Sequence, residues 1–199
     1  MTSVRHTPSP NRVADDLLLD AALECVLAVG VRRTTLSDVA RKAGVSRMTL
    51  YRRFPDIHGM LSALMTREFG GVIAAATEAA STRPTARERV VISAVHAIRA
   101  LHDNSLMRTV LERDTEMMAP YIMDRIGTTQ RLTEGYLKAQ FAEGHEDGSI
   151  REGDADVQAR SFFLILQPYA ISLRPSTSDI KLEALLDELS RMLDIVLRP

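Results

Sequence analysis

The amino-acid sequence predicts an all-α protein. Ala and Leu favour helices, and apolar residues make up 45% of the chain and recur with helical spacing along most of it. No segment shows the alternating pattern with tight turns that is typical of β-hairpins. Only 5% of the residues are aromatic and there is no Trp, so aliphatic residues must fill the core. We expect about nine helices, arranged as an N-terminal three-helix unit and a C-terminal helical bundle.

The N-terminal part opens with an arm and a first helix. Residues 1–12 contain Ser, Thr, Asn and two prolines, and we expect them to be disordered. From Asp15 an apolar face recurs with helical spacing, and Gly30 is placed to end that helix because glycine tolerates the left-handed conformation there. Thr35 and Asp38 form a T-x-x-D version of the capping box, which starts a second, short helix.

The second helix is followed by the turn Gly44–Val45–Ser46. Gly44 can adopt the left-handed conformation that a tight turn needs, and Ser46 can cap the helix that follows. This third helix is expected over residues 47–54, and Asp56 caps a longer fourth helix. Two short helices joined in this way predict a helix-turn-helix.

The rest of the chain has the pattern of a helical bundle. The stretch STRPT, residues 81–85, is the clearest internal break and a candidate domain boundary. Five further helices are expected, over residues 85–102, 105–113, 119–143, 154–173 and 178–197. Pro168 removes a backbone hydrogen bond inside the fourth of these, so we expect it to kink or end that helix.

The composition disfavours several classes of protein. Cys25 is the only cysteine, which excludes an internal disulfide and favours a reducing, cytoplasmic location. The N-terminus lacks the apolar segment of a signal peptide, and no apolar run approaches the roughly 20 residues that cross a membrane. His96 and His102 lack the spacing of paired metal ligands. No G-x-S-x-G, P-loop or dinucleotide motif is present, so we expect no enzyme, no cofactor and no metal.

Charge is unevenly distributed, although the net charge is only -1. Residues 1–60 contain nine Lys and Arg against six Asp and Glu, whereas residues 61–199 contain sixteen against twenty. The third helix concentrates hydrogen-bond donors, which are Arg47, Thr49, Tyr51, Arg52 and Arg53. A helix of about two turns can present such a face to a major groove. The sequence therefore predicts that this helix binds DNA.

The stretch TTLSDVARKAGVSRMTLYRRFPD, with LLLDAALECVLAVGV upstream, resembles the DNA-binding part of TetR-type transcriptional repressors over roughly residues 13–65. Several spacings agree at once, from the Thr-Thr pair through Ala-Gly-Val-Ser to Leu-Tyr-x-x-Phe. The resemblance implies a TetR-like fold. A helix-turn-helix DNA-binding domain is expected at residues 13–60, and a ligand-binding and dimerisation domain at residues 61–199.

The resemblance assigns two groups of residues that contact DNA. The phosphate contacts are expected from Thr35, Ser46 and the hydroxyl of Tyr51. The contacts to bases or backbone are expected from Arg47, Met48, Thr49 and Arg52. Arg53 completes the predicted DNA-binding set, although the family usually has an aromatic residue or His at this position. Met48 stands where the family often has a small residue, so we expect its apolar side chain to touch a thymine methyl group.

These features predict a homodimeric repressor that binds a palindromic operator in double-stranded DNA. The resemblance implies that a small effector in the C-terminal bundle favours a conformer whose two heads no longer fit successive major grooves. Two alternatives stay open at this point. One is an activator or architectural DNA-binding protein without a small-molecule ligand, and the other is an enzyme that uses the bundle as its site.

The effector pocket is expected where methionine and aromatic residues gather. Its predicted residues are His96, Met117, Met118, Tyr121, Phe162 and Gln167. No charged residue is central to this group, so we expect a mostly neutral, apolar ligand. The helix over residues 178–197 has more regularly spaced apolar residues than one buried face needs. The predicted dimer interface therefore consists of Leu182, Leu186 and Leu189.

Overall fold

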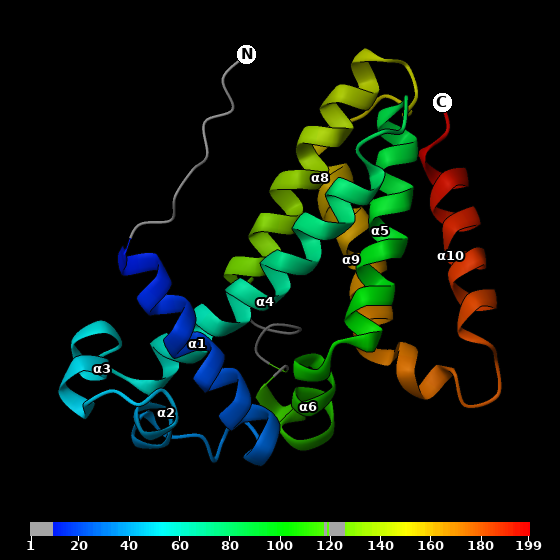
Figure 1. Ribbon diagram of the computed structural model, residues 1–199. Helices are drawn as coiled ribbons and strands as arrows, with labels where there is room; N and C mark the ends of the chain where they lie inside the picture. Colours follow the sequence, from blue (N-terminus) through cyan, green and yellow to red (C-terminus); the bar gives the residue numbers. More distant parts are fainter. Residues whose placement is uncertain (1–9, 118, 120–125) are drawn as a thin grey trace.

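The computed structural model describes residues 10–117, 119 and 126–199, and for these residues the all-α class is confirmed (Figure 1). The helices in chain order are α1 (Pro10–Val29), α2 (Leu36–Lys42), α3 (Arg47–Arg53), α4 (Ile57–Ala80), α5 (Ala86–Asp103), α6 (Ser105–Arg113), the short 3-10 helix η1 (Thr115–Met117), α8 (Thr128–Glu146), α9 (Ala155–Ser176) and α10 (Leu182–Leu197). We call α1, α2, α3 and the first half of α4 the head, and α5, α8, α9 and α10 the bundle. Helix α4 runs from the head to the bundle (Figure 1).

Two hydrophobic cores hold the head and the bundle. The head core draws buried residues from α1, α2, α3, α4 and α6, among them Val26, Val39 and Leu50. The bundle core draws its buried residues from α5, α8, α9, α10 and the connection between α8 and α9. Met60 and Leu61 both belong to the head core and lie within the continuous helix α4. The expected domain division between residues 60 and 61 therefore falls inside a helix.

The turn between α2 and α3 forms as predicted. Gly44 has a φ of +67°, the left-handed conformation that favours glycine. The Ser46 hydroxyl accepts a hydrogen bond from the Thr49 backbone N–H at 3.1 Å and so caps α3. The Thr35 hydroxyl likewise caps α2 by accepting from the Asp38 backbone N–H at 3.2 Å. The Asp38 carboxylate accepts from the Thr35 hydroxyl at 2.6 Å, so the predicted box is only half formed.

Helix α1 begins earlier than the sequence pattern indicated. Its first residue is Pro10, and proline suits the first position of a helix because its missing N–H would have no helical partner there. Residues 10–12 therefore belong to the helix and not to the predicted arm, while residues 1–9 lie outside the described part. Gly30 ends α1 with a φ of +87°, as predicted.

The helices of the bundle differ from prediction mainly at their starts. Ile126 and Gly127 are not helical and α8 begins at Thr128, so the helix expected over residues 119–143 was placed too early. Residue 119 is helical, and residues 120–125 of that prediction lie outside the described part of the chain. Helix α10 begins at Leu182 and not at residue 178. By contrast, α5 and α6 match the expected ranges to within one residue.

Helix α9 passes through Pro168 and continues to Ser176, so the expectation that Pro168 could end the helix is wrong. Leu166 and Leu173 are both buried in the bundle core, one on each side of the proline. Their packing outweighs the one backbone hydrogen bond that proline removes. Figure 1 shows the last turns of α9, which also contain Pro175, bending towards the start of α10.

A buried carboxylate ties α6 to the connection between α1 and α2. Asp114 is only 4% exposed, and its two oxygens accept from the backbone N–H groups of Val31 at 2.7 Å and Arg32 at 3.3 Å. Arg113 donates to the Ala28 carbonyl at 3.0 Å from the same helix end. The segment that leads towards the predicted effector residues is thus bonded directly to the head.

Candidate nucleic-acid interface

Helix α3 presents one face to solvent and one to the head core. Leu50 is fully buried and Phe54 packs partly against the same core, as the sequence predicted. On the other face Met48 is 78% exposed and Tyr51 is 44% exposed. The exposed side chains of this face are Arg47, Met48, Thr49, Tyr51 and Arg52. A thioether, two hydroxyls and two guanidinium groups are available there for bases and phosphates.

The two capping hydroxyls in the predicted set are already engaged. Ser46 Oγ lies 2.9 Å from Thr49 Oγ1, besides capping the helix. The Thr35 hydroxyl gives its proton to Asp38, whose other carboxylate oxygen accepts from Arg41 at 2.6 Å. Both residues are exposed. The Thr35 hydroxyl must give up its bond to Asp38 before it can donate to a phosphate, whereas the Ser46 hydroxyl can donate outward when Thr49 is the donor of their shared bond.

The three arginines of α3 differ in their surroundings. Among the residues that the structure describes, Arg47 and Arg52 have no carboxylate partner. Arg53, in contrast, donates from Nε and Nη2 to both carboxylate oxygens of Asp15 on α1. The hydrogen bonds that Arg53 donates to Asp15, together with the negative charge of Asp15, raise the pKa of Arg53. The free positive charge of α3 therefore lies on Arg47 and Arg52, and Arg53 is the member of the predicted set with an internal partner.

The cations of α2 are also paired. Lys42 Nζ lies 2.5 Å from a carboxylate oxygen of Glu24 on α1, and this hydrogen bond raises the pKa of Lys42. Arg41 pairs with Asp38 within its own helix. Exposed pairs of this kind add little stability, but they cancel charge locally. Of the Lys and Arg residues on α2 and α3, only Arg47 and Arg52 therefore lack a carboxylate partner among the described residues.

The described members of the predicted effector set differ in their surroundings. His96 is exposed on α5, and Gln167 is half-buried on α9. Phe162 is 2% exposed, and its ring packs edge-to-face on Phe141 with centroids 5.6 Å apart. This packing places Phe162 in the bundle core, and its assignment to the effector pocket stays a prediction. Met117 ends η1, and the two remaining predictions, Met118 and Tyr121, lie outside the described residues.

The three leucines predicted for the dimer interface pack against the bundle core. Leu186 and Leu189 are 1% and 0% exposed and belong to the bundle core, where α10 packs on α5. Leu182 packs partly against the same core. A side chain with no exposed surface cannot contact a second molecule, so the regular leucine spacing of α10 serves the chain's own packing.

Sequence reasoning missed an apolar face on α8 and α9. Four large hydrophobic residues are 43–61% exposed there, namely Leu132, Val157, Leu164 and Ile165. The three on α9 recur at i, i+7 and i+8, the spacing of one helix face. The sequence contains this spacing, but the leucines of α10 form a more regular pattern, and the predicted interface was placed on them.

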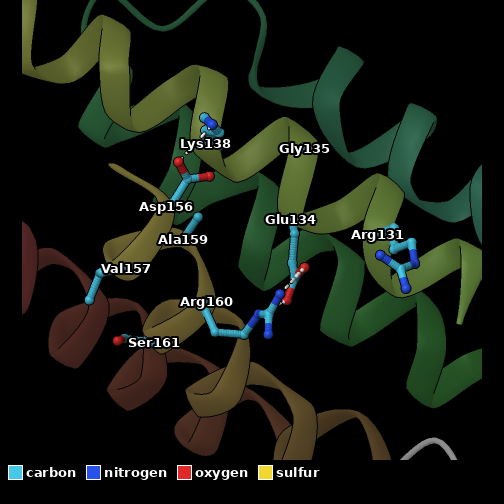
Figure 2. A pocket seen from close by; sticks show the side chains of 9 residues that line it. All are labelled: Arg131, Glu134, Gly135, Lys138, Asp156, Val157, Ala159, Arg160 and Ser161. Carbon is cyan, nitrogen blue, oxygen red and sulfur yellow. Dashed lines mark hydrogen bonds and ion pairs between the residues drawn. The ribbon is translucent and has the colours of Figure 1, made fainter. Parts of the chain in front are cut away.

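A hollow lies between α8 and α9 at one end of this face (Figure 2). Two ion pairs cross it, from Arg160 to Glu134 and from Lys138 to Asp156, the latter with 2.7 Å between Nζ and the carboxylate oxygen. Gly135, Val157 and Ala159 supply its apolar surface. These four charges pair with each other and hold α8 to α9, and Arg131 is a further charged residue of the lining.

The described residues contain no cluster of His, Cys, Asp and Glu that could hold a metal ion. None of the described helices is long and apolar enough to cross a membrane.

Comparison with known proteins identifies a family whose members resemble this chain. Residues 18–64 match the family model of bacterial regulatory proteins of the tetR family. An HTH-type transcriptional regulator of Mycobacterium bovis is 34% identical over 177 residues, which are 89% of this chain and 90% of the relative. The fatty acid metabolism regulator protein of Bacillus subtilis is 28% identical over 141 residues, 68% of this chain and 70% of the relative.

The fold is also shared with solved structures. The transcriptional regulator FadR from Bacillus subtilis, solved in complex with stearoyl-CoA, superposes with a TM-score of 0.68 at 20% sequence identity. The superposition covers 92% of this chain and 99% of that one. The likeness therefore extends over the head and the bundle together.

Proposed function

The chain belongs to the TetR family of bacterial transcriptional regulators, and we propose that it is a homodimeric repressor that a small, mostly apolar effector releases from a palindromic operator. The observation that carries the DNA-binding part is the exposed face of α3. On this face Arg47 and Arg52 have no carboxylate partner among the described residues, and Met48 is 78% exposed.

On DNA, α3 lies in the major groove. Arg47 and Arg52 contact phosphates or the acceptor edge of guanine, and the Tyr51 hydroxyl donates to a phosphate. Met48 offers an apolar surface to a thymine methyl group. A single head of this size makes few contacts, so two heads on two half-sites are needed for specific affinity.

The proposed dimer forms through the exposed face of α8 and α9. Leu132, Val157, Leu164 and Ile165 expose apolar surface to water in one copy of the chain. Exposed apolar side chains with charged residues beside them are typical of a protein interface. The Arg160–Glu134 and Lys138–Asp156 pairs fix α8 against α9, so the face is rigid before it meets the second copy.

The proposed effector is an apolar molecule that binds the bundle and favours a conformer with misplaced heads. Two relatives support this class, because one is named a fatty acid metabolism regulator and one was solved with stearoyl-CoA. The amides of Val31 and Arg32 donate to Asp114 and so hold the end of α6 to the connection after α1, and α6 directly follows α5 of the bundle in the chain. The effector acts only through its different affinities for the two conformers.

Selection of bound fragments from random DNA tests the DNA-binding part. We expect an enriched inverted repeat whose half-sites lie about 10 base pairs apart, or a multiple of that, because two symmetric heads must meet one face of the duplex. Two copies of the chain should bind each fragment. Recovery of fragments without a shared sequence would contradict a sequence-specific regulator.

Thermal unfolding in the presence of candidate ligands tests the effector part. A panel of fatty acids and acyl-CoA thioesters of different chain lengths is added to the protein, and any stabilising compound is then added to the complex with DNA. A true effector raises the melting temperature and releases the DNA. If no member of the panel does either, the alternative of a DNA-binding protein without a small-molecule ligand gains support.

A further inference from the structure

The Asp15–Arg53 pair links the recognition helix to α1. Arg53 lies in the last turn of α3, and Asp15 is 38 positions earlier in the sequence. The guanidinium donates from both Nε and Nη2, so the carboxylate is held by two bonds in a fork geometry. The fold, and not the local sequence, brings these two groups together.

The surroundings of the pair favour the internal partner over an external one. The Asp15 side chain is 22% exposed and the Arg53 side chain 54% exposed. A phosphate that approaches Arg53 meets a guanidinium whose charge is already balanced, with a carboxylate next to it that repels the phosphate. Arg53 can give a DNA phosphate its full charge only when Asp15 releases it.

We propose that Asp15 limits the affinity of this protein for its operator by keeping Arg53 away from the DNA phosphates. Each head then offers DNA only two of the three arginines of α3, namely Arg47 and Arg52. This inference rests on the proposed DNA-binding function. A moderate operator affinity suits a regulated protein. An effector can weaken DNA binding by no more than the difference between its affinities for the two conformers, so very tight DNA binding would resist release.

The test compares Asp15→Asn with the wild type by measuring the DNA dissociation constant over a series of salt concentrations. Each additional phosphate contact steepens the dependence of log K on log salt by about 0.9. We expect tighter binding at low salt, and a slope steeper by about 1.8 for two heads. Asp16→Asn is the matched control, since it makes the same charge change one position along α1. Asp16 lies 4.0 Å from Arg67, which keeps closer partners in Asp20 and Glu68.

A second variant keeps the proposal falsifiable if Asp15→Asn unfolds. Arg53→Gln removes the cation, and we expect it to leave the salt slope of the wild type unchanged, because Arg53 makes no phosphate contact there. The combination Asp15→Asn with Arg53→Gln should also return to the wild-type slope. The proposal is overturned if Arg53→Gln flattens the slope by about 1.8, or if a folded Asp15→Asn behaves like Asp16→Asn. Absence of any specific binding by the wild type would instead overturn the proposed function.

Discussion

Tyr51 is the residue of α3 whose contribution to DNA binding can be isolated by removing one atom. Its ring is 44% exposed, so Tyr51→Phe should not disturb the head. We expect the loss of its hydrogen bond to a phosphate to cost about 1 kcal/mol per head, measured as weaker binding in a fluorescence anisotropy titration. Tyr169→Phe on α9 is the control and should bind like the wild type. Equal affinities for all three proteins would remove the Tyr51 hydroxyl from the phosphate contacts.

Asp114 should matter for stability more than any surface carboxylate. Asp114→Ala leaves the buried N–H of Val31 and the adjacent N–H of Arg32 without their acceptor. We expect the free energy of unfolding to fall by about 1–3 kcal/mol, measured by urea denaturation. Glu116→Ala, which removes the exposed partner of Arg32, should change it by less than about 1 kcal/mol. A stable Asp114→Ala protein would show that the amides find water instead.

Arg53 shows where sequence reasoning fails at the scale of residues. The residue types on α3 correctly predicted an exposed polar face and the buried position of Leu50, because a two-turn helix on a small core has one inner side. The pairing of Arg53 with Asp15 was not predictable, since it depends on how α1 crosses α3. Local spacing shows which residues share a face of one helix, but not which charge a neighbouring helix brings to it.

At the scale of elements, α9 offers the sharpest test of the proposed dimer. Leu164 is 57% exposed in one copy, so Leu164→Glu should fold normally. In the dimer it would bury an unpaired carboxylate, which costs several kcal/mol, and sedimentation velocity should show a monomer. Ile195→Glu on α10, where the wild-type side chain is 61% exposed, should remain dimeric. If Ile195→Glu dissociates and Leu164→Glu does not, the interface lies on α10.

Phe162 tests whether its neighbourhood in the bundle contains spare volume. Its ring is 2% exposed and packs on Phe141, so Phe162→Trp should overpack the core and lower the free energy of unfolding by about 1–3 kcal/mol. Phe163→Trp, at a half-buried position one residue along α9, should be tolerated better. A Phe162→Trp protein as stable as the wild type would indicate an unfilled space beside this residue. That result would support Phe162 as a residue of the effector pocket.

The number and order of the helices were predictable, whereas their roles were less so. Caps at Thr35, Ser46 and Asp56 mark helix starts through local hydrogen bonds, and the sequence predicted all three. The leucines of α10 also indicated a buried face correctly. Periodicity does not reveal which chain buries a face, so the leucines of α10 fitted both a dimer interface and the core of the chain itself.

At the scale of the whole molecule, the head and the bundle have separate cores but are joined twice. Helix α4 is continuous between them, and Asp114 bonds the end of α6 to the connection that follows α1. The sequence predicted two functional parts and placed the division between residues 60 and 61. The sequence could not show how the two parts are joined, because Asp114 accepts hydrogen bonds from backbone groups 83 and 82 positions earlier in the chain. In the proposed mechanism, these two links carry a change in the bundle to α3.

The central claim is that the exposed face of α3 binds DNA, and the salt dependence of DNA binding by Arg47→Ala tests it most directly. Arg191→Ala, which removes an exposed arginine from α10, is the control. If Arg47 of each head contacts a phosphate, Arg47→Ala binds the selected DNA more weakly. The slope of log K against log salt is then flatter by about 1.8, while Arg191→Ala matches the wild type. An Arg47→Ala protein with the affinity and slope of the wild type would contradict the account.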